Sequence, residues 1–499
     1  MLRVNALAGT GKTTTAVFGA GAKVPKGMKV SDEQKAIIEE MRSYKAGSIA
    51  ATAFNVSIVE ELKGRMPLHC DVRTSNSFGN ALIGLSHGVK RRQVSNKKNG
   101  DIFFKISDGK LSKGRQMEMF PIVVKYMDLC KCFLMKGDDP SDLDYLSDRF
   151  GIDKDMEIYQ YVQDAMKVGN TMTDYIDFND QIYLPWFYGM KVPTYDMVIV
   201  DEAQDLNRAK QWLALEMSKG GQLVIIGDPN QAIYGFSGAD SESMDTVWSQ
   251  MLDRDPASTT LPLTITRRCP KVVVELAKKY VPEFKYHKDA PDGLILHTPE
   301  KEFLDDLFIE EGSRMVLCRT NAPLMQLGFK LIAGRRRCFI MGKDIGAGLK
   351  TDISKTKETD LARAVDKACD TLKEKYVREC DLRRGDPNKA EALLDRIQCI
   401  RMIYENLGVN PTISDYNNYI ESMFKHSGGP NDIMLSTVHK AKGLEHEHVS
   451  IIHPSKLPLP LKKAKPFQVQ QEKNLTYVAY TRTKHTLEFV KEEEQRIEK

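Results

Sequence analysis

Residues 8–15 read AGTGKTTT, and no other segment constrains the fold of this chain as strongly. They follow an apolar, strand-like run from Leu2 to Ala6 and precede a helical pattern. Dense negative charge such as polyphosphate is bound by backbone N–H groups that approach it closely, which Gly9 and Gly11 allow, and by the N-terminus of the helix behind them. The segment therefore predicts a phosphate-binding P-loop in a parallel α/β sheet. The alternative is a glycine-rich turn that only caps a helix.

The side chains of this loop predict a bound nucleotide and a magnesium ion. Lys12 has the length and charge to reach the β and γ phosphates, and the hydroxyl of Thr13 is a ligand that Mg²⁺ accepts. The loop residues expected to line the nucleotide are Ala8, Gly9, Thr10, Gly11, Lys12, Thr13 and Thr14.

Acidic residues follow a second apolar run. Met197 to Val200 leads directly into Asp201 and Glu202, so both carboxylates are expected at the carboxyl end of a buried parallel strand, where ligands of α/β proteins bind. Asp201 is suited to hold the metal ion, directly or through water, and Glu202 is suited to polarise an attacking water. The alternative is that these residues only cap a helix.

A third run, LVIIGDPNQAIYGFSGAD at 223–240, ends in polar residues. Gln231 is expected to sense the γ-phosphate from this third strand end. Tyr234 and Phe236 follow in a turn-rich stretch, where they serve either as core residues or as platforms on which nucleic-acid bases stack.

The pattern of short apolar runs followed by turns and helical periods predicts an α/β fold with two parallel-sheet lobes and helical insertions. The strand candidates are Leu2 to Ala6, Ser48 to Phe54, Met197 to Val200, Leu223 to Ile226, Met315 to Cys318 and Val449 to Ile452. We expect a first lobe at 1–84 and 172–260, an insertion at 85–171, a second lobe at 261–346 and 430–499, and a helical insertion at 347–429.

Composition excludes several classes of protein. Lys and Arg total 72 against 68 Asp and Glu, a net charge of +4, so any nucleic acid must be bound through local patches. No run approaches the roughly 18 apolar residues of a membrane helix, and the first residues are too short an apolar stretch for a signal peptide, so we expect a cytoplasmic protein that does not contact a membrane. The nine cysteines lack a CxxC pair, which favours free thiols over a zinc site.

Taken in order, these segments resemble the motifs of the UvrD-like helicases of superfamily 1, the group that includes Rep and PcrA. The resemblance covers nearly the whole chain. Beside the three segments above, the blocks that carry it are AFNVSIVEELKGR at 53–65, RTSNSFG at 73–79, DFNDQIYLP at 177–185, LTITRRCP at 263–270, LCRTN at 317–321, LSTVHKAKGLEHEHV at 435–449 and NLTYVAYTRTKHTL at 474–487.

The resemblance implies two RecA-like lobes and an ATP-dependent DNA helicase that moves 3′ to 5′ on single-stranded DNA, with ATP and Mg²⁺ as cofactors. Arg268 and Arg482 would be arginine fingers that make hydrolysis depend on closure of the cleft, and Glu445 would touch the nucleotide sugar. The residues at DNA-contacting positions are Phe54, Asn55, Thr74, Asn76, Tyr234, Phe236, Thr437 and His439.

Two other functions remain open. An ATP-driven translocase that displaces or loads proteins on single strands, without processive unwinding, would carry the same motifs. A non-catalytic binding module would have lost a residue of the P-loop, of DEAQD or of the last block, and none is lost. The expected partners are single-stranded DNA, duplex junctions and replication or recombination proteins; an RNA track is also compatible with phosphate contacts and stacking. The compact insertions suggest a phage-type member, which would work in the host cytoplasm.

The chain departs from the family pattern at several positions. Val56 stands where the family often has Lys, Asn76 where it often has His, and Phe236 replaces a Trp. No glutamine precedes the P-loop to read the edge of adenine, and Arg267 replaces a base-stacking Tyr, so weak discrimination of ATP from GTP is expected. Gln34 belongs to an amphipathic helix by its spacing; the competing interpretation is that it folds back to read adenine.

Overall fold

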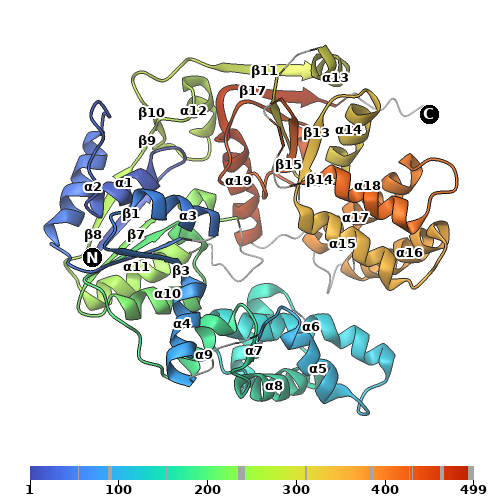
Figure 1. The fold of residues 1–499 in the computed structure, drawn as a ribbon, viewed down its shortest axis with the longest axis horizontal. Coiled ribbons are helices and arrows are strands. Elements are labelled where there is room, and N and C mark those ends of the chain that lie inside the picture. Colours follow the sequence, from blue (N-terminus) through green and yellow to red (C-terminus); the bar gives the residue numbers. More distant parts are fainter. Residues whose placement is uncertain are drawn as a thin grey trace. The chain divides into compact units, whose positions relative to one another are not determined.

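The computed structural model describes residues 1–53, 56–87, 93–152, 154–233, 242–309, 312–380, 387–425, 428–429, 431–460 and 466–492. The chain divides into two units, Met1–Thr264 and Ile265–Lys499. Each unit contains a parallel β-sheet with helices packed on it (Figure 1). This arrangement confirms the predicted α/β class with two parallel-sheet lobes.

The sheet of the first unit has the strand order β3-β2-β6-β7-β1-β8, and all of its strand pairs are parallel. The four central strands were predicted from their apolar runs, whereas the two edge strands were missed because they are half exposed and carry polar residues. The expected boundary at 260/261 falls inside β8. The strands are β1 (Leu2–Ala6), β2 (Ile49–Ala53), β3 (Cys70–Thr74), β6 (Met197–Asp201), β7 (Gln222–Gly227) and β8 (Thr259–Leu263).

Successive side chains of these strands enter two different cores, because neighbouring residues of a strand point to opposite faces. In β6, Met197 and Ile199 join a cluster with α1, α2 and α3, while Val198 and Val200 join a cluster with α4, α10 and α11. Both faces of the sheet are therefore covered by helices. Their bounds are α1 (Lys12–Gly19), α2 (Asp32–Ser43), α3 (Val56–Arg65), α4 (Ser75–His87), α10 (Arg208–Met217) and α11 (Ser243–Arg254).

The insertion of the first unit has a hydrophobic core of its own, to which α9 also contributes. Its helices lie together in Figure 1, beside α4 and α9. The elements of this part of the chain are β4 (Gln93–Val94), α5 (Lys98–Ser107), α6 (Lys113–Phe133), α7 (Pro140–Phe150), α8 (Met156–Asn170) and β5 (Tyr175–Ile176), followed by α9 (Asp180–Phe187).

A buried ion cluster, formed by Lys98, Lys131, Asp177 and Asp180, joins the insertion to the turn ahead of α9. Lys98 Nζ lies 2.7 Å from one carboxylate oxygen of Asp180, and Lys131 Nζ lies 2.8 Å from the other and 2.5 Å from Asp177. The two lysines hold the pKa of Asp180 below its ordinary value although burial alone would raise it. The four charges are thus buried as a matched set.

The sheet of the second unit has the strand order β11-β17-β16-β12-β15-β13-β14 and is also parallel throughout. The predicted strands at 315–318 and 449–452 are confirmed as β12 and β16. The strands are β11 (Leu294–Pro299), β12 (Arg314–Cys318), β13 (Cys338–Met341), β14 (Phe424–Lys425), β15 (Ile433–Thr437), β16 (His446–Ile451) and β17 (Thr483–Lys491). A separate parallel pair is formed by β9 (Ile265–Thr266) and β10 (Lys285–Tyr286).

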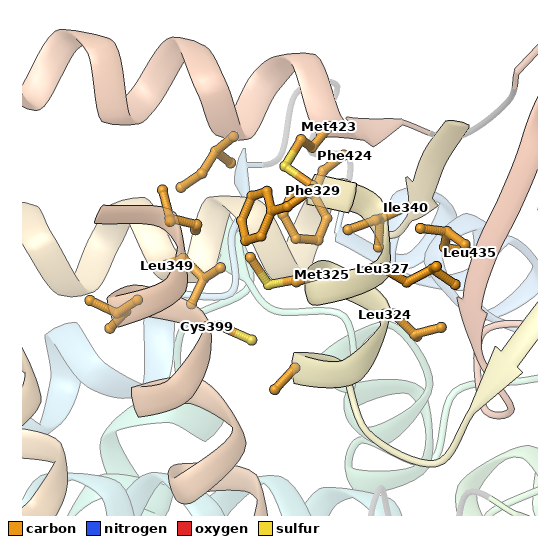
Figure 2. Packing of buried hydrophobic residues seen from close by; sticks show 14 of the residues in the cluster. Leu324, Met325, Leu327, Phe329, Ile340, Leu349, Cys399, Met423, Phe424 and Leu435 are labelled. Atoms are coloured by element: carbon orange, nitrogen blue, oxygen red, sulfur yellow. The ribbon is translucent and has the colours of Figure 1, made fainter. Parts of the chain in front are cut away.

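The helices at 343–423 share one core with this second sheet. Figure 2 shows Met325 and Phe329 of α14 packed among residues of the sheet, such as Ile340 and Leu435, and residues of the following helices, such as Leu349. The helical segment begins at Lys343, four residues ahead of its expected start. The helices are α12 (Lys271–Ala277), α13 (Glu300–Ile309), α14 (Ala322–Ala333), α15 (Lys343–Lys355), α16 (Leu361–Glu379), α17 (Pro387–Asn406), α18 (Ile413–Met423) and α19 (Pro466–Tyr480).

All nine cysteines are free thiols, as predicted. Among the described residues, no group of three or more His, Cys, Asp or Glu side chains is arranged to hold a metal ion. None of the described helices is long and apolar enough to span a membrane.

Candidate functional site

The P-loop connects β1 to α1, as its sequence predicts. Gly9 and Gly11 adopt positive φ angles of 68° and 86°, which a residue with a side chain adopts only with strain. Gly11 is the N-cap of α1, and the buried Thr10 donates a 2.8 Å hydrogen bond to the carbonyl of Leu7. The loop therefore has the backbone form that brings N–H groups close to phosphate oxygens.

Three loops meet at the carboxyl edge of this sheet because β6, β7 and β1 are adjacent in it. The P-loop follows β1, the DEAQD segment begins at Asp201, the last residue of β6, and the GDPNQ segment begins at Gly227, the last residue of β7. The predicted nucleotide residues of the first half of the chain are thus brought to one edge. This edge is our candidate nucleotide site.

The two residues predicted to hold the metal ion are in direct contact. Thr13 Oγ1 donates a 2.7 Å hydrogen bond to Asp201 Oδ2, and the backbone N–H of Glu202 donates to the other carboxylate oxygen at 2.9 Å. Burial and the neighbouring Glu202 carboxylate raise the pKa of Asp201 to about 6. A buried carboxylate beside a hydroxyl is a hard-oxygen pair of the kind that Mg²⁺ binds, so these two residues fit the expected ion.

The catalytic candidates form a polar network around Glu202. Lys12 Nζ lies 3.5 Å from Glu202 Oε2, which also accepts a 2.5 Å hydrogen bond from Gln204 Nε2. The amide oxygen of Gln204 accepts from the backbone N–H of Asp228 at 3.0 Å, and Gln231 donates to the Asp228 carboxylate at 2.6 Å. Gln204 thus ties the loop after β6 to the loop after β7. Nothing in its local sequence predicted this role.

Gln34 lies against the P-loop, although it follows that loop in the chain. It is 4% exposed, its Nε2 donates a 3.0 Å hydrogen bond to Thr15 Oγ1, and a Cβ placed on Gly11 would lie 3.0 Å from the same nitrogen. Its other amide atom, Oε1, accepts from the N–H of Ser31 at the start of α2. The predicted helix is confirmed, and the same side chain also supports the P-loop.

Arg65 is a further residue of this region that the sequence did not single out. It is the last residue of α3, and its Nη2 donates a 2.7 Å hydrogen bond to Thr14 Oγ1 in the first turn of α1. Its Nη1 pairs with Glu61 at 2.6 Å. A guanidinium at the positive end of a helix favours an anion nearby, because the helix end and the arginine repel each other.

The second unit holds the other predicted nucleotide residues. Arg268 Nε lies 2.5 Å from Glu445 Oε2, and Lys484 Nζ lies 2.7 Å from Glu445 Oε1. Burial alone would raise the pKa of Glu445, but Lys484 and Arg268 lower it below its ordinary value. Arg267, the residue before this group, is exposed.

Arg482, the second predicted arginine finger, has hydrogen-bond partners within its own unit. Its side chain is 1% exposed and donates to the carbonyls of Val478 at 2.9 Å and Leu444 at 3.1 Å, both within the second unit. The guanidinium is therefore buried and hydrogen-bonded to its own unit. A sequence motif identifies the arginine, but it does not show which groups accept hydrogen bonds from the guanidinium.

Two of the predicted DNA-contacting residues lie where β3 ends and α4 begins: Thr74 is the last residue of β3, and Asn76 lies in the first turn of α4. Thr74 Oγ1 accepts from the N–H of Ser77 at 3.1 Å, and Asn76 Nδ2 donates a 2.6 Å hydrogen bond to the carbonyl of Phe178. The Phe178 ring was not predicted as a contact, and it is 52% exposed. The turn that carries Phe178 is fixed by the buried ion cluster, because Asp177 and Asp180 on either side of it pair with Lys98 and Lys131.

Two more of the predicted DNA-contacting residues lie at the end of β15 in the second unit: Thr437 is the last residue of that strand, and His439 follows it. Burial, with Arg319 and Lys440 nearby, lowers the pKa of His439 to about 3, so its ring is neutral at pH 7. The predicted contacts Phe54, Asn55, Tyr234 and Phe236 lie outside the described residues.

Comparison of the sequence with known protein families identifies the family of this chain. A profile described as the UvrD/REP helicase N-terminal domain matches residues 1–251, and one described as the UvrD-like helicase C-terminal domain matches residues 353–494. The chain belongs to the UvrD/REP helicase family, whose members are ATP-hydrolysing DNA helicases. The predicted resemblance and the predicted two-lobe P-loop fold are confirmed.

Individual relatives are similar over short segments. The mitochondrial ATP-dependent DNA helicase HMI1 of Saccharomyces cerevisiae is 37% identical over 89 residues, which is 17% of this chain and 12% of that protein. DNA helicase II of Haemophilus influenzae is 29% identical over 115 residues, 22% of this chain and 16% of that protein. The aligned segments thus span less than a fifth of either relative.

Solved structures of Arterivirus nonstructural protein 10, a helicase, were found both alone and in complex with DNA. They are 11% and 10% identical, cover 99% of this chain and 60% and 61% of their own, and have TM-scores of 0.34 and 0.33. Scores this low support no statement about function.

Proposed function

We propose that this protein is an ATP-dependent DNA helicase that translocates 3′ to 5′ on single-stranded DNA. The observation that carries the proposal is the meeting of Lys12, Thr13, Asp201 and Glu202 at the ends of adjacent strands. In a chain of the UvrD/REP family, this arrangement is suited to hydrolyse a nucleoside triphosphate.

Each side chain of the candidate site has a distinct part in the proposed hydrolysis. The P-loop N–H groups and Lys12 bind the phosphates, and Gln231 senses the γ-phosphate. Thr13 and Asp201 would hold Mg²⁺, which supplies positive charge to the phosphate oxygens. Glu202 accepts the proton of the attacking water, and the bond from Gln204 fixes the direction of that carboxylate.

The second unit completes the proposed reaction. Arg268 and Arg482 would stabilise the charge that builds on the transferring phosphoryl group, and Glu445 would bind the sugar. Because the arginines belong to a different unit from the P-loop, hydrolysis would depend on closure of the two units. Repeated closure and opening would then move the protein along the strand.

The proposed DNA track combines polar and aromatic contacts. Thr74, Asn76, Thr437 and His439 would bind the strand, and a neutral His439 would do so by hydrogen bonding and not by charge. Phe178 adds an exposed ring, and one base stacked on an aromatic ring contributes roughly 1–3 kcal/mol without reading sequence. Phe54, Asn55, Tyr234 and Phe236 belong to the same proposed track.

We also propose that the protein works in the cytoplasm, on single strands and duplex junctions, with replication or recombination proteins as partners. The expected domain limits around residues 85–171 and 347–429 would make each helical insertion an addition to one ATPase lobe.

The first experiment measures ATP hydrolysis with and without single-stranded DNA, in the parent and in Lys12→Ala. We expect hydrolysis that DNA stimulates and that the variant lacks, while the melting temperatures stay similar because Lys12 serves a ligand and not the core. Equal rates in the two proteins would refute the assignment of the P-loop.

The second experiment separates unwinding from translocation. Displacement of a strand from duplexes with 3′ or 5′ tails is compared with displacement of streptavidin from biotinylated single strands. A helicase of the proposed polarity unwinds the 3′-tailed duplex. Streptavidin displacement without unwinding would instead identify a translocase that remodels protein–DNA complexes.

A further inference from the structure

The first turn of α2 holds two separate parts of the first unit through adjacent side chains. Glu33 accepts two hydrogen bonds from Thr264, from the backbone N–H at 2.8 Å and from the hydroxyl at 2.6 Å. Gln34 donates to Thr15, whose hydroxyl in turn donates a 2.9 Å hydrogen bond to the carbonyl of Gly11 in the P-loop. One turn of helix therefore touches both the P-loop and Thr264.

Hydrogen bonds between Ser31 and Gln34 fix the backbone of this first turn of α2. Ser31 and Gln34 form a reciprocal capping box, in which the Ser31 side chain accepts from the N–H of Gln34 at 3.2 Å and the Gln34 side chain accepts from the N–H of Ser31 at 3.1 Å. A capping box fixes the backbone at the start of a helix. A displacement of Gln34 must therefore carry Glu33 with it.

Thr264 occupies a special place in the chain. It follows β8 and is the last residue of the first unit, so the chain enters the second unit immediately after it. Arg268 is only four residues further on, and four residues span at most about 14 Å. The carboxylate of Glu33 thus holds the chain just ahead of a proposed phosphate-contacting arginine.

We propose that Glu33 is a positioning residue that couples occupancy of the P-loop to the placement of Arg268. The inference rests on the proposed ATP hydrolysis and extends it. Phosphate binding fixes Gly11 and Thr15, Gln34 follows Thr15, and Glu33 transmits the displacement to Thr264. Hydrogen bonds to a carboxylate are roughly twice as strong as neutral ones, which makes this end of the connection firm.

A purely structural role for Glu33 makes a different prediction. A bond that only secures the end of β8 would lower the melting temperature when it is lost, but it would leave the turnover of the folded enzyme unchanged. A positioning role lowers kcat, since small misplacement of a catalytic group costs up to about a hundredfold in rate. The KM for ATP should change little because Glu33 does not reach the P-loop itself.

The test measures kcat and KM for ATP at saturating single-stranded DNA, and the melting temperature, in Glu33→Gln and Thr264→Val. Both substitutions keep the side-chain shape and weaken the bond. We expect kcat to fall by at least about tenfold in each, with KM within about threefold of the parent. The double variant should be no worse than the more impaired single variant, because both remove one connection.

Two control variants make the result specific. Thr264→Ser keeps both donors and should retain the kcat of the parent. Asp32→Asn removes a neighbouring acid of the same helical turn, whose 98% exposed side chain pairs with Lys35 and not with Thr264, and its kcat should also be unchanged. An equal loss in Asp32→Asn would show a general charge effect and overturn the proposal.

Normal kcat in either Glu33→Gln or Thr264→Val also overturns the inference, whether or not the melting temperature falls. Failure of the proposed function itself looks different. In that case the parent would show no DNA-stimulated hydrolysis that Lys12→Ala abolishes, and the Glu33 variants would have no rate to lose.

Discussion

Thr13 and Asp201 are 188 positions apart in the chain, and a 2.7 Å hydrogen bond joins their side chains. The parallel sheet creates this contact, because β1 and β6 flank β7 and present their following loops at one edge. The threonine contributes a hydroxyl and the aspartate a carboxylate that is almost completely buried. A cation between them would relieve the cost of ionising Asp201.

That cost predicts a pH-dependent stability. The folded protein keeps the Asp201 proton up to about pH 6, whereas the unfolded chain releases it near the ordinary pKa of 3.8. The free energy of unfolding therefore falls as pH rises between these values. Asp201→Asn lacks this ionisation, so its stability relative to the parent should increase by about 1–3 kcal/mol from pH 4 to pH 7. Urea unfolding in metal-free buffer measures the difference, and a difference that stays constant with pH would contradict the assignment.

Arg65 should affect nucleotide binding more than turnover. Its guanidinium lies beside Thr14, close to where the nucleotide phosphates are expected, and a hydrogen bond to a charged group contributes about 1.5 kcal/mol or more. Arg65→Met should therefore raise the KM for ATP by about tenfold and change kcat by less than about threefold. Lys63→Met is the matched control, because Lys63 forms a comparable exposed ion pair with Glu60 on the same helix. Equal effects of the two substitutions would argue against a specific role.

Gln34 allows a test of nucleotide selectivity. Both ends of its amide are engaged, with Ser31 and Thr15, and it supports a backbone that ATP and GTP use alike. We expect the parent to prefer ATP over GTP by less than about tenfold, and Gln34→Ala to lower kcat/KM for both nucleotides. Arg267→Ala should raise KM for both, since a cation over a base is tolerant of its identity. A parent preference above a hundredfold that Gln34→Ala abolishes would mean that this side chain reads adenine.

Arg482 should matter both for folding and for hydrolysis. Its removal takes away the donor to the Leu444 carbonyl and one of the two side-chain donors to the Val478 carbonyl, which also accepts from Thr481 Oγ1, so Arg482→Ala should lose about 1–3 kcal/mol of unfolding free energy. Loss of an arginine finger also slows hydrolysis by about a thousandfold or more. Arg482→Lys keeps the charge without the planar fork and separates the effects. If folded Arg482→Lys hydrolyses ATP at the parent rate, Arg482 is not a finger.

In the first sheet the four buried central strands could be predicted from sequence and the two edge strands could not, whereas in the second sheet only β12 and β16 were predicted and the interior strands β13, β15 and β17 were missed. Strands such as β6 read as uninterrupted apolar runs because helices cover both faces. β17 was missed because it carries the buried Glu488, which lies 3.1 Å from Arg314 of β12 and also accepts a hydrogen bond from Thr298 of β11. An acid inside a strand obscures the apolar pattern unless its distant partner is known.

Only part of the candidate site could be predicted from the sequence. Lys12, Thr13, Asp201 and Glu202 belong to motifs whose residue types and spacing indicate their chemistry. The hydrogen bonds made by the side chains of Gln204, Arg65 and Glu33 join segments that are remote in the sequence, and no local sequence pattern predicts them. They could be found only once the fold had brought those segments together.

The buried ion cluster limits how far this chain can be shortened. Lys98 and Lys131 come from the helical insertion, whereas Asp177 and Asp180 lie on the segment that leads back into the ATPase lobe. Excising the helices to obtain a minimal ATPase would remove both lysines and expose Asp177 and Asp180 to solvent, so the contacts that fix the turn ahead of α9 would be lost. Such a deletion removes more than an accessory module: it destabilises the turn that leads into α9. The insertion and the lobe should therefore be expressed and engineered as one piece.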